Sequence, residues 1–201
     1  MNSDRKIWND FRCGENYALS YIYYQYVQFL FRYGKKITDN ENLVKDTIQD
    51  LFVNLIRTRE NLGETDNIRF YLLRSFRRML LKNIRNQNSI FSSLSEEDLL
   101  PEIIYSAEQD FIEKEQENHQ NEVIKKALQQ ISPKQREILF YRFTCEFEYD
   151  QICELMSLKY DSARKQVFRA IKALKGVMTD VNIILFLFPV MSSSKKSQKN
   201  N

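Results

Sequence analysis

The sequence has few of the residues that interrupt regular secondary structure. Its 201 residues include four glycines and three prolines, and a protein of many short strands needs more of both at its turns. One histidine, His119, and three cysteines without a CxxC pair give no spacing typical of a metal site. We therefore predict an all-α protein with no metal and no cofactor, and we expect Cys13, Cys145 and Cys153 to be buried, reduced thiols.

Long hydrophobic runs and catalytic motifs are also missing. The one strongly apolar run begins at Val181 and reads VNIILFLFP, far short of the roughly 20 residues that a membrane helix needs. The first residues lack the charged-then-apolar pattern of a secretory signal, so we expect a cytoplasmic location. Without a phosphate-cradling glycine loop or a nucleophile–base pair, we expect neither an enzyme nor a small-molecule substrate.

The charges that are present occur in blocks. The formal net charge of +3 is too small to indicate nucleic-acid binding by itself. Residues 68–88, however, hold six basic side chains and no acid, residues 92–117 hold nine acids and one lysine, and residues 159–175 hold six basic side chains and one acid. This order predicts two functional modules joined by an acidic connector.

Three helices are predicted in the first half of the chain. The first, residues 16–33, is rich in aromatics, and Gly34 is a plausible stop. The second starts at a cap formed by Asp39 or Asn40 and ends at Gly63. Its spacing predicts a buried stripe of Val44, Ile48, Leu51 and Leu55, with Asp46, Gln49, Asp50 and Val53 on the other face.

The third helix, residues 67–88, combines a basic face with aromatic residues. At 100° per residue its cations fall within about 140° of arc, opposite an apolar face. The basic face consists of Arg74, Arg77, Arg78, Lys82 and Arg85, and the apolar face of Leu72, Phe76, Met79 and Leu80. Phe70 and Tyr71 lie beside the basic side. Such a helix is either a solvated charged face or a nucleic-acid surface, with cations for phosphates and rings for unstacked bases.

The second half of the chain predicts a helix-turn-helix. Ser132, Pro133 and Gln135 form the start of a helix with a capping box. A short helix through Met156 follows, then a turn at residues 157–160, then a helix capped by Asp161. Its buried stripe is Ala163, Val167, Ala170 and Leu174. In this motif the second helix enters the major groove, so we expect its outer residues at base edges or phosphates: Lys159, Ser162, Arg164, Lys165, Gln166 and Arg169.

Taken in order, these motifs resemble the bacterial RNA polymerase sigma factors of the extracytoplasmic-function (ECF) type. DTIQDLF, with Asp46, Gln49 and Phe52, is similar to a region 2 motif of that family. FYLLRSFRRMLLKNIR is similar to its promoter-opening helix, and residues 132–174 resemble region 4, although many members have glycine where Ser157 stands. The resemblance implies region 2 at residues 1–89, an acidic linker at 90–118 and region 4 at 119–178, followed by an apolar and then basic tail at 179–201.

The resemblance also implies partners and residue roles. Asp46, Gln49 and Asp50 would bind core RNA polymerase, while Phe52 belongs to the core of the fold. The aromatic and basic residues from Phe70 to Arg85 would engage the −10 promoter element as it opens, and those from Lys159 to Arg169 would read the −35 element as duplex. A membrane-anchored anti-sigma factor is a further partner that many members have.

Two other interpretations stay open at the level of the sequence. A helix-turn-helix regulator with an N-terminal sensing or dimerisation domain explains residues 120–176 equally well, and a helical adaptor would bind no DNA. The tail offers a similar choice. Residues 183–188 pack back on region 4, or the apolar strip at 181–191 is a docking surface for an inhibitor.

Overall fold

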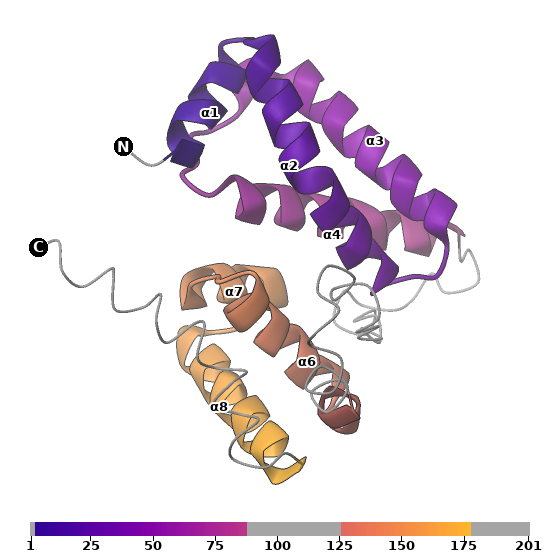
Figure 1. Ribbon diagram of the computed structural model, residues 1–201, viewed down its shortest axis with the longest axis vertical. Coiled ribbons are helices and arrows are strands. Elements are labelled where there is room, and N and C mark those ends of the chain that lie inside the picture. The colour runs from indigo at the N-terminus through magenta and orange to yellow at the C-terminus, as the bar shows by residue number, and fades with distance from the viewer. Residues whose placement is uncertain (1–2, 88–125, 178–201) are drawn as a thin grey trace, which may run out of the picture. The chain divides into compact units, whose positions relative to one another are not determined.

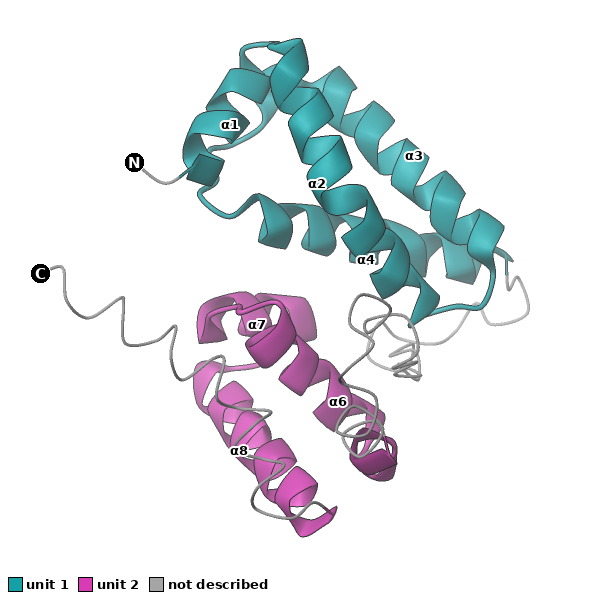
Figure 2. Cartoon of the chain, viewed as in Figure 1, with its two compact units in different colours: residues 1–101 teal, residues 102–201 magenta. Residues whose placement is uncertain are grey.

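In a computed structural model, the chain forms two compact units, residues 1–101 and 102–201 (Figure 2). The structure describes residues 3–87 and 126–177. Within these two ranges the regular structure is helical and contains no strand, as predicted. The predicted acidic linker at 90–118, the tail at 179–201, His119 and Val123 lie outside the described residues. No helix in the described ranges is both long and apolar enough to cross a membrane.

Unit 1 is a bundle of four helices (Figure 1): α1 (Ser3–Arg12), α2 (Asn16–Lys35), α3 (Glu41–Thr58) and α4 (Ile68–Gln87), with a short 3-10 turn, η1 (Arg59–Asn61), after α3. Helices α2, α3 and α4 pack against one another, and α1 packs on α2 and α4. The predicted stripe of α3 is buried. On α4, Leu72, Phe76 and Leu80 are buried as predicted, whereas Met79 is only half-buried.

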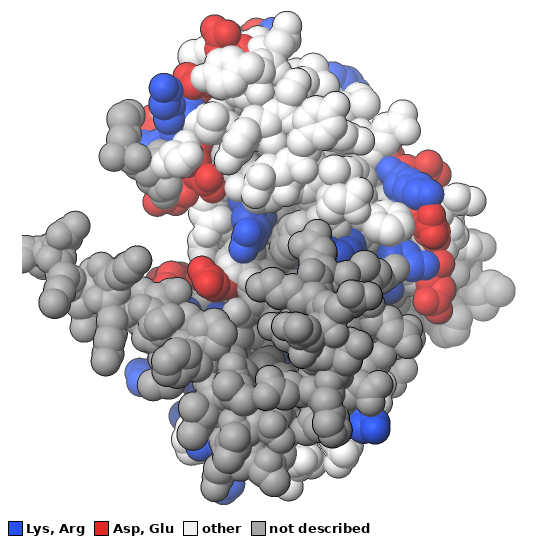
Figure 3. Space-filling view, in the orientation of Figure 1, with Lys and Arg blue, Asp and Glu red and all other residues white. Residues whose placement is uncertain are grey.

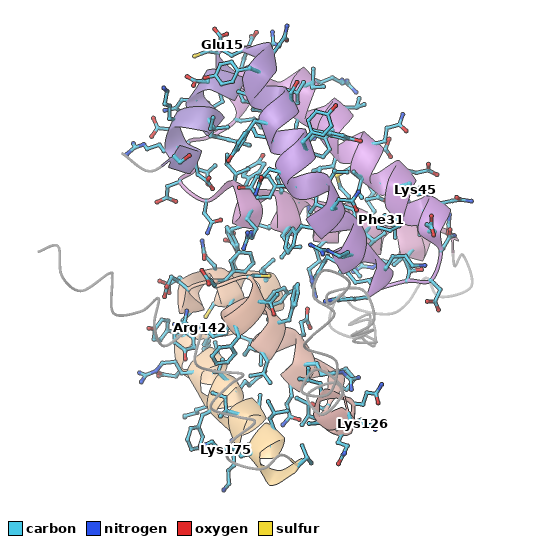
Figure 4. All side chains as sticks on the ribbon, viewed as in Figure 1. Glu15, Phe31, Lys45, Lys126, Arg142 and Lys175 are labelled. Carbon is cyan, nitrogen blue, oxygen red and sulfur yellow. The ribbon has the colours of Figure 1, made fainter. Side chains whose placement is uncertain are left out.

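The start of α3 is fixed as the sequence predicts. The side chain of Asn40 accepts a hydrogen bond from the backbone N–H of Leu43 at 3.1 Å, which satisfies one of the unpaired donors of the first turn. Glu41, in that turn, pairs with Lys45 one turn later, and the Lys45 ammonium lies 5.9 Å from the centre of the Phe31 ring of α2 (Figure 4). Residues of α3 thereby cover the outer edge of α2.

Gly34 does not stop α2, contrary to the prediction. The helix continues to Lys35, and Gly34 is buried inside it. A Cβ atom at this position would lie 2.6 Å from Val44 Cγ1 and 3.1 Å from Phe76 Cζ. Glycine is therefore needed because α2 approaches α3 and α4 closely here, and not because its backbone ends the helix.

Unit 2 contains a helical segment at residues 126–130, then α6 (Pro133–Leu139), the π-helical turn η2 (Phe140–Thr144), α7 (Tyr149–Met156) and α8 (Tyr160–Val177). Both α6 and α7 pack against α8. The predicted capping box of α6 is present: Ser132 Oγ accepts from the N–H of Gln135, whose side chain accepts from the N–H of Ser132. Leu128 and Ile131 are buried as expected.

Arg136 ties α6 to the helical segment before it. Its guanidinium donates to the backbone carbonyls of Leu128, Gln129 and Ile131 at 3.0–3.3 Å. These carbonyls lie at or just after the end of that segment, where the helix itself supplies no donors. One cation on α6 thus closes the preceding helix.

The three cysteines are in different environments. Cys145 is buried, Cys153 is half-buried and Cys13 is exposed, so the expectation of three buried thiols is confirmed for Cys145 only and is wrong for Cys13. Desolvation, and then the nearby Asp150 carboxylate, raise the pKa of the Cys153 thiol. A raised pKa keeps this thiol protonated and unreactive near neutral pH.

Candidate nucleic-acid and polymerase interfaces

The basic face of α4 begins at a well-defined helix start. Asn67 Oδ1 accepts a hydrogen bond from the N–H of Phe70 at 2.9 Å, and α4 buries Ile68, Leu72, Leu73, Phe76, Leu80 and Leu81 in unit 1. Arg74, Arg78 and Lys82 are exposed, while Arg77 and Arg85 are half-buried. The structure therefore brings the predicted cations together along one side of a single helix, with the core on the other side.

The two predicted aromatic residues at the start of α4 are half-buried. The ring of Tyr71 lies against Trp8 of α1, with 4.7 Å between ring centroids. Trp8 is fully buried, and its indole N–H donates to the carbonyl of Gly63 at 2.8 Å. Sequence reasoning missed α1 entirely. The signal for it was the only tryptophan of the chain with Phe11 three residues later, a helical spacing.

The predicted polymerase-binding residues lie on the solvent side of α3. Asp46, Gln49 and Asp50 are exposed, and Phe52 is buried, as predicted. The Phe52 ring contacts Tyr23 of α2 at 5.0 Å between centroids. Two apolar side chains that follow on α3, Val53 and Ile56, are exposed as well.

Helix α2 carries no charged side chain from Asn16 to Phe31. Tyr17, Tyr21, Tyr23 and Tyr24 are nevertheless exposed, and Figure 3 shows the resulting uncharged area on unit 1. Tyr23 links this area to α3 through Phe52. An aromatic-rich surface with few charges is typical of protein–protein interfaces, so the exposed face of α2 is a candidate protein-binding surface.

Helices α7 and α8 form the predicted helix-turn-helix. Helix α7 starts with a capping box between Glu148 and Gln151 and buries Ile152 and Leu155. It ends at Ser157, whose backbone is left-handed with φ 53° and ψ 44°. Helix α8 begins at Tyr160, so Asp161 lies within its first turn and is not its cap. The carboxylate still faces a helix N-terminus, where negative charge is favourable.

The face of α8 that points away from the core is rich in basic residues. Its predicted stripe of Ala163, Val167, Ala170 and Leu174 is buried. On the outer side Lys159, Arg164, Lys165, Arg169, Lys172 and Lys175 are exposed, and Ser162 and Gln166 are half-buried. The structure thus places all six predicted DNA-contacting residues outside the core of unit 2.

Phe168 is a surface residue of α8 that the sequence analysis did not select. Its side chain is 68% exposed among the cations of the outer face. Its position, five residues after Ala163 and one after Val167, puts it well away from the buried stripe, which was the available signal. The outer face of α8 therefore carries a large apolar side chain among its cations.

Among the described residues, no cluster of three or more His, Cys, Asp or Glu side chains is arranged to hold a metal ion. The arrangement that the structure offers is instead one of exposed cations and rings on two separate helices. Groups of this kind can bind the phosphates and bases of nucleic acids.

Comparison with known families decides the identity of the two units. A family model described as Sigma-70 region 2 matches residues 22–90, and one described as Sigma-70, region 4 matches residues 121–174. The chain belongs to the sigma-70 family of sigma factors. Region 2 covers α2 to α4, and region 4 covers the helix-turn-helix. The order of the two regions is that of the ECF-type sigma factors, as the sequence motifs indicate.

The solved structure of CnrH resembles this sigma factor in fold, and two further solved structures match it in part. CnrH, solved in complex with the cytosolic domain of CnrY, is 13% identical with a TM-score of 0.54, covering 87% of this chain and 96% of CnrH. RpoE, from its complex with the anti-sigma factor NepR from Bartonella quintana, is 16% identical with a TM-score of 0.49, covering 77% and 92%. A third match is a chain of the RsbN–BldN complex, 14% identical with a TM-score of 0.34, covering 85% and 99%. A search of curated protein sequences gives no match.

Family membership excludes one open interpretation. A plain helix-turn-helix regulator would account for α7 and α8 but not for a sigma region 2 over residues 22–90. The basic face of α4 and the exposed Asp46–Asp50 face of α3 therefore belong to a sigma factor module.

Proposed function

We propose that this ECF-type sigma factor binds core RNA polymerase and directs initiation at specific promoters, reading the −35 element as duplex and the −10 element as it opens. The observation that carries the proposal is the outer face of α8. This face presents exposed cations from the second helix of a helix-turn-helix, which is the geometry that places side chains at base edges in the major groove.

For the −35 element, we assign direct readout to the first half of α8. Arg164, Lys165 and Arg169 suit guanine O6 and N7, and Gln166 suits adenine N6 and N7. Lys159 and Ser162 flank them at the entry of the helix. Phe168 adds an apolar side chain to the same face, and a phenylalanine in the major groove recognises the methyl group of thymine.

For the −10 element, we assign the basic face of α4 to backbone phosphates and the two rings at its start to unstacked bases. Arg74, Arg78 and Lys82 are exposed along the helix, and cations near phosphates release bound counterions. Phe70 and Tyr71 are only half-buried, so part of each ring stays accessible for stacking. Arg77 and Arg85 extend the same face.

Opening of the promoter requires the polymerase as a partner. Unstacking duplex costs about 1.4 kcal/mol per step, or roughly 14 kcal/mol for a ten-step bubble, whereas each base stacked on an aromatic ring returns about 1–3 kcal/mol. Two captured bases cannot balance this cost. We propose that Asp46, Gln49 and Asp50 of α3 bind core polymerase, with the exposed apolar edge of Val53 and Ile56 beside them.

Regulation by a protein inhibitor is part of the proposal. CnrH, which shares the fold, was solved with the cytosolic domain of CnrY. By analogy, we propose that this chain acts in the cytoplasm and is held inactive by a membrane-anchored anti-sigma factor. The uncharged, tyrosine-rich face of α2 is the surface of unit 1 with the composition of a protein interface.

Substitution of α8 tests the proposal. A holoenzyme is assembled from core polymerase and the variant K165A/R169A, with K134A as control because Lys134 is an exposed lysine of α6 in the same unit. The promoter is the sequence most enriched when the wild-type holoenzyme transcribes a randomised library. We expect the double variant to lose footprint protection of the −35 duplex, with at least a tenfold loss of affinity. Full protection by the double variant would contradict the assignment of α8.

A further inference from the structure

The N-terminal helix α1 makes a set of contacts with the start of α4 that the packing of a bundle does not require. Asp4 Oδ2 accepts a hydrogen bond from the N–H of Ile68 at 3.0 Å, across 64 residues of sequence. Ile68 is the first residue of α4, so its N–H has no partner within the helix. The carboxylate of Asp4 therefore works together with Asn67, which serves the N–H of Phe70.

Trp8 fixes the segment just before α4 and the ring just after its start. The indole N–H holds the carbonyl of Gly63 at 2.8 Å, and the indole ring lies against Tyr71 with 4.7 Å between centroids. Trp8 is fully buried and also contacts Phe11 of its own helix. The position of the Tyr71 ring is thus set by α1, since one of its sides is covered by a rigid, hydrogen-bonded indole.

A third contact lies at the surface. The guanidinium of Arg5 pairs with Glu64 at 2.8 Å, and both side chains are more than half exposed. An exposed ion pair of this kind contributes little. The part-buried hydrogen bonds of Asp4 and Trp8 are therefore the contacts that hold residues 63–71 against α1.

Tyr26 of α2 lies close to Asp4. Burial is the main cause that raises the pKa of Tyr26 to about 12, and the negative charge of Asp4 and a hydrogen bond to it contribute as well. The phenol therefore stays protonated at neutral pH and remains able to donate to the carboxylate. Asp4 thus lies between a donor on α2 and a donor on α4.

We infer that α1 acts as a brace that positions Phe70 and Tyr71 for capture of opened −10 bases, with Asp4 and Trp8 as its positioning residues. This inference rests on the proposed function of α4. Neither residue needs to touch DNA. Asp4 orders the first turn of α4, and Trp8 restricts the orientation of Tyr71, so the rings meet the unstacked bases without first losing conformational freedom.

The experiment measures promoter opening by the complete holoenzyme. The substitutions are D4A, D4N and W8F, with K6A as the matched control because Lys6 is exposed on the same helix. Opening is followed by 2-aminopurine fluorescence at the −10 element of the library-selected promoter. Each variant is measured on the intact duplex and on a template whose −10 strands are non-complementary. Binding to the −35 duplex and the circular dichroism of each variant are recorded in parallel.

We expect D4A and W8F to slow opening of the duplex about tenfold. On the pre-opened template, their rates should differ from that of the wild type by less than twofold. D4N keeps an oxygen acceptor, and its rate should lie between those of D4A and wild type. K6A should match wild type. Equal rates for D4A and wild type on the duplex would overturn the inference, and so would an equal loss on both templates, which indicates a merely structural role.

Failure of W8F to fold and failure of the proposed function can both be distinguished from failure of this inference. If W8F does not fold, the comparison of D4A with D4N decides the question, because Asp4 is at the surface end of the brace and is only half-buried. If the wild-type holoenzyme opens no promoter at all, the proposed function fails before α1 is tested.

Discussion

Two residues of unit 2 have a backbone conformation that favours glycine, and replacing them should stabilise the helix-turn-helix. Glu146, between η2 and α7, has φ 58°, and Ser157, at the end of α7, has φ 53°. A side chain in the left-handed region costs about 1–2 kcal/mol. Glycine removes this cost but adds about 0.4–1 kcal/mol of chain entropy to the unfolded state. The net expectation is about 0.5–1 kcal/mol of added stability for E146G and for S157G.

The matched control is E154G. Glu154 is also an exposed glutamate, but it lies within α7, two residues before its end, where the backbone is helical and glycine costs up to about 1 kcal/mol. The same exchange should therefore stabilise at 146 and destabilise at 154. For a domain of 60–100 residues each kcal/mol shifts the melting temperature by about 4–8 °C.

The assay is denaturation of the full chain followed by two probes. The only tryptophan, Trp8, lies in unit 1, so its fluorescence reports that unit, while circular dichroism reports both. E146G and S157G should shift the unfolding transition of unit 2, which is seen by circular dichroism. They should leave the transition seen by Trp8 fluorescence unchanged. A loss of stability in E146G or S157G would refute the argument from backbone conformation.

Three other predictions follow from the structure. G34A should destabilise unit 1 by about 1–3 kcal/mol in chemical denaturation, because its Cβ would overlap Val44. The control G176A has no atom within 4 Å of its Cβ, so it should be neutral or stabilising. Equal effects of the two substitutions would contradict the role of Gly34 in close packing. The pKa of Tyr26 is raised from 10.0 to about 12, chiefly by burial, so unit 1 should lose stability as the pH rises from 10 to 12. In alkaline denaturation Y26F should lose less stability over this range than the wild type. The same pH profile for both proteins would contradict this prediction. K172A should weaken holoenzyme binding to promoters of every sequence alike. In fluorescence anisotropy it should lower the slope of log affinity against log salt concentration by about 1. A loss of affinity confined to one promoter sequence would instead assign Lys172 to base reading.

Periodicity predicts the helices after α1 because each has an apolar face, whereas α1 itself is not predicted. The stripe of α8 and the cap of α3 at Asn40 are local features, and the structure confirms both. The prediction from glycine, in contrast, is wrong at Gly34. Gly34 was interpreted as a helix stop, yet it serves the close approach of three helices, which is a property of packing that the local sequence does not contain.

The limits of sequence reasoning are clearest at the start of α4. The cations of that helix could be selected from their spacing alone. The contact between Trp8 and Tyr71, and the bond from Ile68 to Asp4, join residues more than 60 positions apart, so no local pattern predicts them. The local sequence does not single out Phe168 either, because apolar residues are expected inside a helix bundle and polar ones on its outer face.

The most direct test of the account is transcription by a reconstituted holoenzyme. Core polymerase without any other sigma factor is combined with this protein and a randomised promoter library, and the start sites of the transcripts are sequenced. The account predicts start sites that share two sequence blocks upstream, separated by a fixed distance. The block farther from the start site should be lost when K165A/R169A replaces the wild type. Transcripts no more abundant than with core polymerase alone, or start sites that share no sequence block, would contradict it.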